Sequence, residues 1–273
     1  MNQPHLGRSP PWWVRRVRPL IAWLLLGFAV AVVAIAVLDG LTARWTFASS
    51  ESRKLDASST AEGYEAVVIE YAREIPDMPA PENYSIWPLR TQLLIDSLVL
   101  EPAYAGLLLL YGLALRRLAG RGAASEGWDW PFQLMCLLLA AGVMYDLAEN
   151  GMIVRAAEDG LWHLLAQPTM VDVHDATRLK WTFLGAATLM IGLFARDRRI
   201  PPVRPWLGIG AWAAIIVAPL AAIQGVRLRF GTPLDGVLTM GLFVAFGVAL
   251  VALGRAVWQL SDAIPREAVA NAD

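Results

Sequence analysis

Ionisable and amide side chains interrupt three long apolar segments of this 273-residue chain. The interrupting residues are Asp96, Glu101, Asp146, Glu149, Asn150 and Lys180. A charged side chain near the middle of a bilayer costs about 2.5–3.5 kcal/mol on insertion scales, so such residues usually face the interior of a helix bundle and have a partner. We treat these six residues as one candidate site, which we call the polar cluster.

The spacing of the acidic residues brings them to common helix faces and to similar depths. Asp146 precedes Glu149 by three residues and Asn150 by four, so these three side chains share one face of a helix. With a rise of about 1.5 Å per residue, Glu101 lies about 12 Å and Asp146 about 10 Å below the outer edge of the membrane. The carboxylates of two different segments are therefore predicted to be level with each other.

Two cations and a proline accompany the carboxylates. Lys180 and Arg178 enter the membrane from the same outer side, and their long side chains can reach down toward the acidic residues. Pro102 has no N–H, so the carbonyl of Leu98 loses its helical donor close to this polar layer.

Three functions remain open for such a cluster. The first is structural: Lys180 neutralises Asp146 or Glu149 and fixes the register of two helices. The second is proton- or cation-coupled transport, because close carboxylates in a low dielectric cannot all stay ionised and one can carry a proton. Six spans without an inverted repeat are few for a transporter, an objection that a homo-oligomer would remove. The third is a membrane-embedded enzyme with an outward-facing site, with or without a metal ion.

Motifs of known catalytic and metal sites are weak in this chain. His163, His174 and Asp175 lie near the outer side and are candidate metal ligands, but their spacing matches no standard zinc motif, and we predict no cofactor. Ser97 has no accompanying base within the membrane, which disfavours serine-protease chemistry. The single cysteine, Cys136, excludes an intrachain disulfide.

The polar residues also form a recognisable pattern along the chain. In order, the pattern is Asp96 with Pro102 and Tyr104, then Asp146, Glu149 and Asn150, then Lys180. It resembles a pattern in uncharacterised bacterial multi-pass integral membrane proteins of about this size. No activity is assigned to that family, so the resemblance implies only that these residues act as one unit.

The composition explains where these side chains must lie. Hydrophobic residues make up 56% of the chain and charged residues 17%, with a mean hydropathy of +0.46, whereas soluble domains have roughly 45–50% apolar and 25% charged residues. This surplus excludes a soluble enzyme. Nucleic-acid binding is excluded as well, because no basic domain is present. The strong preference for Arg over Lys indicates GC-rich coding and a bacterial source.

Six apolar segments, each long enough to cross a bilayer, predict an all-α polytopic bundle. The predicted spans are 19–38, 93–115, 132–153, 179–195, 206–225 and 235–254. The first span is longer than the apolar region of a signal peptide, so we expect an uncleaved anchor. The flanking and connecting segments are 1–18, 39–92, 116–131, 154–178, 196–205, 226–234 and 255–273. Apolar residues at helical spacing in the 39–92 loop predict a short amphipathic helix at about 59–75.

The distribution of basic residues predicts the orientation. The segments 1–18, 116–131, 196–205 and 255–273 together carry 13 basic and six acidic residues, and the remainder of the chain carries 10 basic and 18 acidic ones. The positive-inside rule therefore places both termini in the cytoplasm and the 39–92 and 154–178 loops outside. For a bacterial protein this means the cytoplasmic, or inner, membrane.

The last predicted span carries a face of small residues. Gly241, Ala245 and Ala249 recur every four residues, a spacing that suits close packing of helices in a bilayer. The expected partners are the lipid bilayer and, through this face, a second copy of the chain.

Overall fold

The computed structural model describes residues 12–42, 87–118, 130–158, 167–197, 200, 204–229 and 236–263, and within these ranges the chain is helical almost throughout, with no strand. Long apolar runs favour helices because every backbone polar group is then bonded within its own segment. In chain order the elements are α1 (Trp12–Thr42), α4 (Trp87–Ile95), the π-helix η2 (Asp96–Leu100), α5 (Glu101–Leu118), α6 (Trp130–Glu158), α7 (Gln167–Ala195), α8 (Arg204–Arg229) and α9 (Gly236–Ala263).

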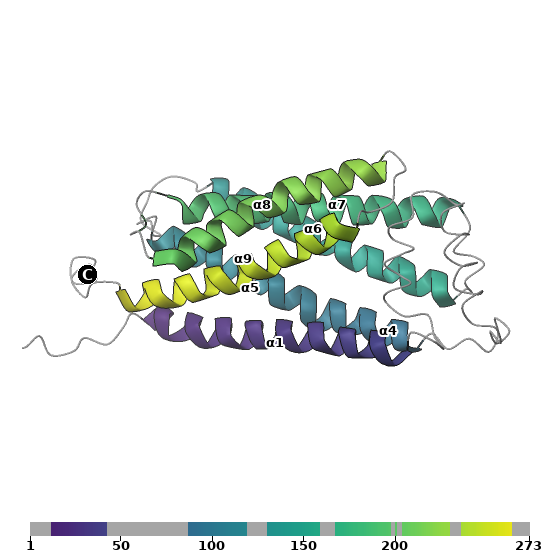
Figure 1. Ribbon diagram of the computed structural model, residues 1–273, viewed down its shortest axis with the longest axis horizontal. Helices are drawn as coiled ribbons and strands as arrows, with labels where there is room; N and C mark the ends of the chain where they lie inside the picture. Colours follow the sequence, from purple (N-terminus) through teal and green to yellow (C-terminus); the bar gives the residue numbers. More distant parts are fainter. Residues whose placement is uncertain are drawn as a thin grey trace, which may run out of the picture.

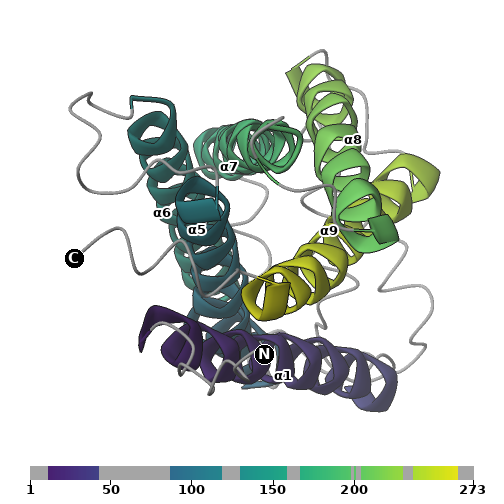
Figure 2. The same ribbon diagram turned by 90° about the vertical axis from the view of Figure 1, so that its left-hand side faces the viewer.

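The helices form an elongated bundle in which consecutive helices run in opposite directions (Figure 1). α4, η2 and α5 follow one another without a break as one long helix. α7 packs between α6 and α8, while α1 packs against η2 and α5. Figure 2 looks along the bundle from the end at which α1 begins, and there α9 lies between α1 and α8.

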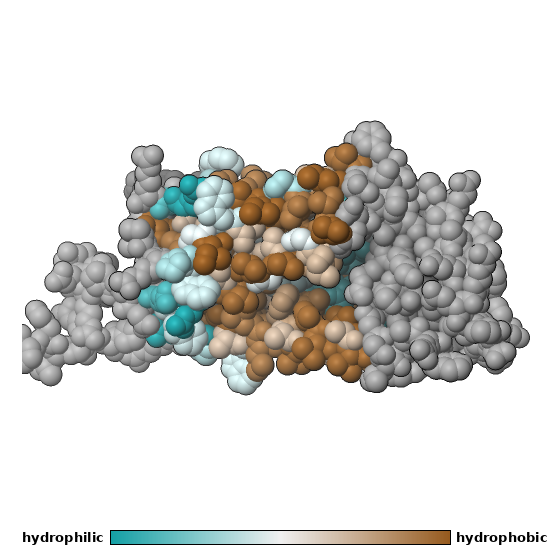
Figure 3. All heavy atoms as spheres, in the orientation of Figure 1, coloured by the Kyte–Doolittle hydropathy of each residue, from teal (hydrophilic) through white to brown (hydrophobic). Residues whose placement is uncertain are grey.

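Five helices in the described part of the chain are long and apolar enough to cross a membrane. They span Arg16–Leu38, Arg90–Arg116, Trp130–Ile153, Pro205–Val226 and Met240–Gln259. Their outer faces are apolar: Trp23 is 70% exposed, Leu137 67% and Met240 64%. Figure 3 shows this hydrophobic surface, with hydrophilic side chains gathered at one end of the bundle. The apolar helices and their apolar outer faces indicate a membrane protein.

The predicted span 179–195 lies in α7, which is not among these five helices. Arg178 and Lys180 stand where the apolar part of α7 begins and lower its hydropathy. The six-span count therefore stays a prediction. The amphipathic helix predicted at 59–75 lies outside the described residues.

Glycines bring α7, α8 and α9 into close contact. A Cβ atom added to Gly192 in α7 would lie 2.9 Å from the backbone oxygen of Ala211 in α8, and one added to Gly210 in α8 would lie 2.9 Å from the backbone nitrogen of Leu253 in α9. These distances are shorter than normal contacts of a Cβ atom. The backbones can approach this closely only because glycine has no side chain.

The small-residue face of α9 packs within the protomer. Ala249 is fully buried and Ala245 packs against the core, and a Cβ on Gly241 would meet the side chain of Leu220 at 3.9 Å. The residues of this face thus have neighbours in their own chain, and the homo-oligomer stays a prediction.

Arginine side chains cover aromatic rings at the end of the bundle where α1 begins and α9 ends. The pairs are Arg18 with Trp258, Arg116 with Phe132 and Arg196 with Trp212, at 5.4, 5.2 and 4.4 Å from guanidinium carbon to ring centroid. Cation–π contacts of this kind hold the basic side chains against neighbouring helices. These arginines belong to the segments whose positive charge predicts that this end faces the cytoplasm.

Candidate functional site

A π-turn positions the first two acidic residues. The N–H of Glu101 donates to the carbonyl of Asp96, five residues earlier, at the end of η2. Pro102 follows directly and, having no N–H, cannot donate to the carbonyl of either Ser97 or Leu98. Side chains five residues apart in an α-helix point about 140° away from each other. The wider turn brings Asp96 and Glu101 onto the same side of the helix. Such π-turns occur frequently at functional sites.

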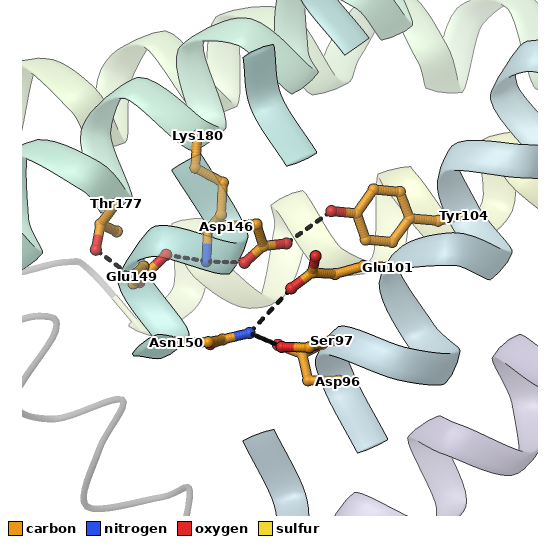
Figure 4. Close-up of polar contacts among 9 residues, drawn as sticks. All are labelled: Asp96, Ser97, Glu101, Tyr104, Asp146, Glu149, Asn150, Thr177 and Lys180. Carbon is orange, nitrogen blue, oxygen red and sulfur yellow. Dashed lines mark hydrogen bonds and ion pairs between the residues drawn. The ribbon is translucent and has the colours of Figure 1, made fainter. Parts of the chain in front are cut away.

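Lys180 joins α6 to α7. Its ammonium lies 2.9 Å from Oδ1 of Asp146 and also pairs with Oε2 of Glu149. The other oxygen of Glu149 accepts a hydrogen bond from the hydroxyl of Thr177 in α7 at 2.7 Å. These side chains are almost fully enclosed by the bundle, since Glu149 is 2% exposed and Asp146 5%. The ammonium thus neutralises one charge of a buried pair of carboxylates (Figure 4).

Asn150 joins α6 to η2 and α5. Its amide nitrogen lies 3.0 Å from Oδ2 of Asp96, 3.1 Å from Oγ of Ser97 and 2.9 Å from Oε1 of Glu101. An amide group has only two N–H bonds, so it cannot form three separate linear hydrogen bonds. Three oxygens therefore compete for two protons at this point.

Tyr104 closes the cluster toward the basic end of the bundle. Its hydroxyl donates to Oδ2 of Asp146 at 2.6 Å, and the ring meets Phe246 of α9 edge to face. One to two turns further along α5, Leu107, Leu108 and Tyr111 are fully buried in the apolar core. In this conformation the polar layer ends at Tyr104.

Glu101 has one oxygen without a hydrogen bond. The side chain is 1% exposed, and Oε1 accepts from Asn150, whereas Oε2 has no hydrogen-bond partner. Figure 4 shows this second oxygen turned toward Asp146. One oxygen from each of Asp96, Glu101 and Asp146 lies within 4.8 Å of the other two. A buried acceptor without a donor is costly, so this position favours a proton or a cation.

The charges of the cluster do not balance. If Asp96, Glu101, Asp146 and Glu149 were all ionised, Lys180 would be the one cation among the described residues to oppose them, and three negative charges would remain uncompensated there. Such an excess is very unfavourable in the interior of a membrane bundle. Protons, a metal ion or both would balance the charge of the described part of the cluster.

The six residues of the polar cluster form two groups, one around Asn150 and one around Lys180, which meet where oxygens of Glu101 and Asp146 lie within 4.8 Å of each other. Arg178 joins neither group. Arg178 instead pairs with Asp175 at 2.8 Å on the surface of α7. The cause is helix geometry, because a residue two positions from Lys180 points about 200° around the axis. Of the candidate metal ligands, Asp175 is thus engaged away from the cluster. His163 and the side chain of His174 lie outside the described residues.

Thr177 carries no charge and was not predicted as part of the site. The signal that points to it is its position three residues before Lys180, on the same face of α7. The hydroxyl of Tyr104 belongs to the site as well, although the sequence marks Tyr104 only through the family resemblance.

Comparison of the chain with models of protein families, with curated proteins and with solved structures finds no match. The resemblance to bacterial multi-pass membrane proteins therefore rests on the quoted residues alone, and the function must be argued from the site.

Proposed function

We propose that this membrane protein binds a small cation, either a proton or a metal ion, at the polar cluster, and that this binding is a step in cation-coupled transport. The observation that carries the proposal is the environment of Glu101. Its Oε2 is buried without a donor and is turned toward Asp146 (Figure 4), and one oxygen from each of Asp96, Glu101 and Asp146 lies within 4.8 Å of the other two. A purely structural cluster would gain by losing such a group, because an unsatisfied buried acceptor lowers stability.

The proposal includes a definite placement. The cluster lies in the outer half of a six-span bundle in the bacterial inner membrane, with both termini in the cytoplasm. The arginines at one end of the bundle support this orientation. The apolar core beyond Tyr104 means that, in this conformation, the cluster exchanges ions with the outer side. Transport then requires a second conformation in which that core opens.

A second candidate function is a structural brace. The contacts of Lys180 with Asp146 and Glu149 favour it, because they hold α6 to α7 without needing any ion. No contact among the described residues favours the third candidate, a membrane enzyme, over these two.

Flux measurements separate the two candidates. The purified protein is reconstituted in liposomes that contain either the pH indicator pyranine or calcein, which Mn²⁺ quenches, and an inward cation gradient is imposed. Transport predicts flux that is lost in Glu101→Gln and retained in Asp197→Asn, a matched carboxylate just beyond α7. Wild-type protein that folds but gives no flux of either ion contradicts transport and leaves the brace.

A further inference from the structure

We infer that the cation is a divalent ion that prefers oxygen ligands, of the Mg²⁺, Ca²⁺ or Mn²⁺ class, held by Asp96, Glu101 and Asp146. This inference rests on the proposed function, since it names the ion that the same site binds. It is carried by the arrangement of the three carboxylates together with the unpartnered Oε2 of Glu101.

The three oxygens are close enough to share one ion. Because no two of them are more than 4.8 Å apart, a point within about 2.8 Å of all three must exist. Calcium binds oxygen at roughly 2.3–2.6 Å, and magnesium at roughly 2.0–2.1 Å. Rotamer adjustments of a few tenths of an ångström therefore suffice for the larger ion, and somewhat greater adjustments for the smaller one.

The type of ligand and the charge select the class of ion. The group consists of carboxylates alone, and among the described residues no imidazole or thiolate joins it. Oxygen ligands suit Mg²⁺, Ca²⁺ and Mn²⁺ better than soft metals. If Lys180 compensates Glu149, three negative charges remain, of which a divalent ion neutralises two and a monovalent ion only one.

The amide of Asn150 stands where it can become a ligand. Its nitrogen, with a partial positive charge, lies about 3 Å from oxygens of Asp96, Ser97 and Glu101. A half-turn of the amide exchanges nitrogen and oxygen with almost no change in shape. The amide oxygen would then face an ion bound between the carboxylates, as Asn oxygens do in calcium sites.

The exposure of the three carboxylates indicates the route of entry. Asp96 is partly exposed, whereas Glu101 and Asp146 are buried. An ion that arrives from outside therefore meets Asp96 first and loses its water stepwise as it passes to the other two. Asp96 should therefore speed the binding of the ion as well as raise the affinity of the site for it.

Manganese is the probe for the test, because free Mn²⁺ gives a six-line electron paramagnetic resonance spectrum that binding removes. We expect the full chain in lipid nanodiscs to bind one Mn²⁺, with Mg²⁺ or Ca²⁺ as a competitor and Na⁺ without effect. Glu101→Gln and Asp96→Asn should each weaken binding at least tenfold, and Asp197→Asn should leave it unchanged. Wild-type protein that leaves the free signal intact, or Glu101→Gln protein that binds like wild type, overturns the inference.

Asn150→Asp provides a second, independent readout. It keeps an oxygen at this position, removes the N–H donors and adds a negative charge beside Asp96 and Glu101. Without Mn²⁺ this variant should melt at a lower temperature than wild type, and Mn²⁺ should raise its melting temperature more than that of wild type. An equal effect of Mn²⁺ on both proteins contradicts a role for Asn150 as a ligand.

The outcomes also separate this inference from the proposed function. If Mn²⁺ does not bind but pyranine reports a proton flux that Glu101→Gln abolishes, the ion is a proton, so the inference fails and the proposed function stands. If neither binding nor flux occurs, both fail.

Discussion

α8 and α9 meet where Gly210 leaves no room for a side chain, whereas α5 and α6 meet through the hydroxyl of Tyr104 and the carboxylate of Asp146. The first contact is apolar and depends on shape, because backbone atoms pack directly against each other. The second depends on charge and on hydrogen bonds, because its members would be unstable in the membrane without partners. α7 takes part in both kinds of contact, with Lys180 at its middle and Gly192 near its C-terminal end.

The two regions should therefore tolerate different kinds of amino-acid substitution. The glycine-packed region should accept no added volume, although it contains no charge that must be paired. The polar region should accept substitutions of similar shape, provided that no ionised group loses its only partner. The following predictions test this contrast, beginning with the largest expected effect.

Lys180→Met should cause the largest loss of stability. It removes the only cation in contact with Asp146 and Glu149 among the described residues, and breaking a buried pair costs about 3–5 kcal/mol. Arg178→Met is the matched control, because its pair with Asp175 is partly exposed and surface pairs contribute about 0–1 kcal/mol. Thermal unfolding in detergent measures both, and equal melting temperatures would contradict the central role of Lys180.

The same substitution in each region gives a direct comparison. Tyr104→Phe removes a hydrogen bond to a carboxylate, worth about 1.5–3 kcal/mol if that group is charged. Tyr111→Phe removes one to the backbone carbonyl of Leu250, worth about 0.5–1.5 kcal/mol. Chemical denaturation should rank Tyr104→Phe as the more harmful, and the reverse order would mean that Asp146 holds no charge there.

Gly210→Ala should destabilise the protein by about 1–3 kcal/mol through overpacking. The added Cβ would lie 2.8 Å from Cγ of Leu253, so α8 and α9 must move apart. Gly208→Ala, in the same helix, has nothing within 4 Å of the added atom and should be neutral or slightly stabilising. Melting temperatures of the pair check this prediction, and a harmful Gly208→Ala would show that contact with lipid outweighs the gain in helix propensity.

Glu101→Gln should have the smallest effect on stability. The amide keeps the shape and can keep an oxygen facing Asn150, while it removes one negative charge from a cluster with an excess of them. In the absence of metal ions its melting temperature should equal or exceed that of wild type. A marked decrease would mean that the carboxylate of Glu101 itself holds the helices together, through its contact with Asn150.

Much of the site could be predicted from the sequence because a charge in an apolar segment is conspicuous. Asp146, Glu149 and Asn150 are marked by type, and their spacing assigns them to one helix face. The π-turn could not be predicted, since nothing in a single sequence distinguishes five residues in one turn from four. Thr177 could not be ranked above the other hydroxyl residues without knowing what faces it.

The glycine contacts illustrate another limit. The face of Gly241, Ala245 and Ala249 is recognisable as a repeat within one helix, but its partner is a property of the folded chain. Gly192 and Gly210 form no repeat, yet they make the closest approaches to neighbouring backbone. Whether a small residue meets lipid or another backbone depends on how the helices are placed in space, which hydropathy does not encode.

The π-turn at Asp96–Leu100 has a consequence for how this protein could lose its site. Inserting one residue into that turn would rotate Asp96 by about 100° relative to Glu101, whereas deleting one would leave the two carboxylates four residues apart on one helix face. Length, hydropathy and charge would hardly change, so the chain would still insert into a bilayer. Entry into the membrane tolerates such an added residue, whereas the alignment of the carboxylates does not, and homologues with a one-residue insertion there should have lost ion binding.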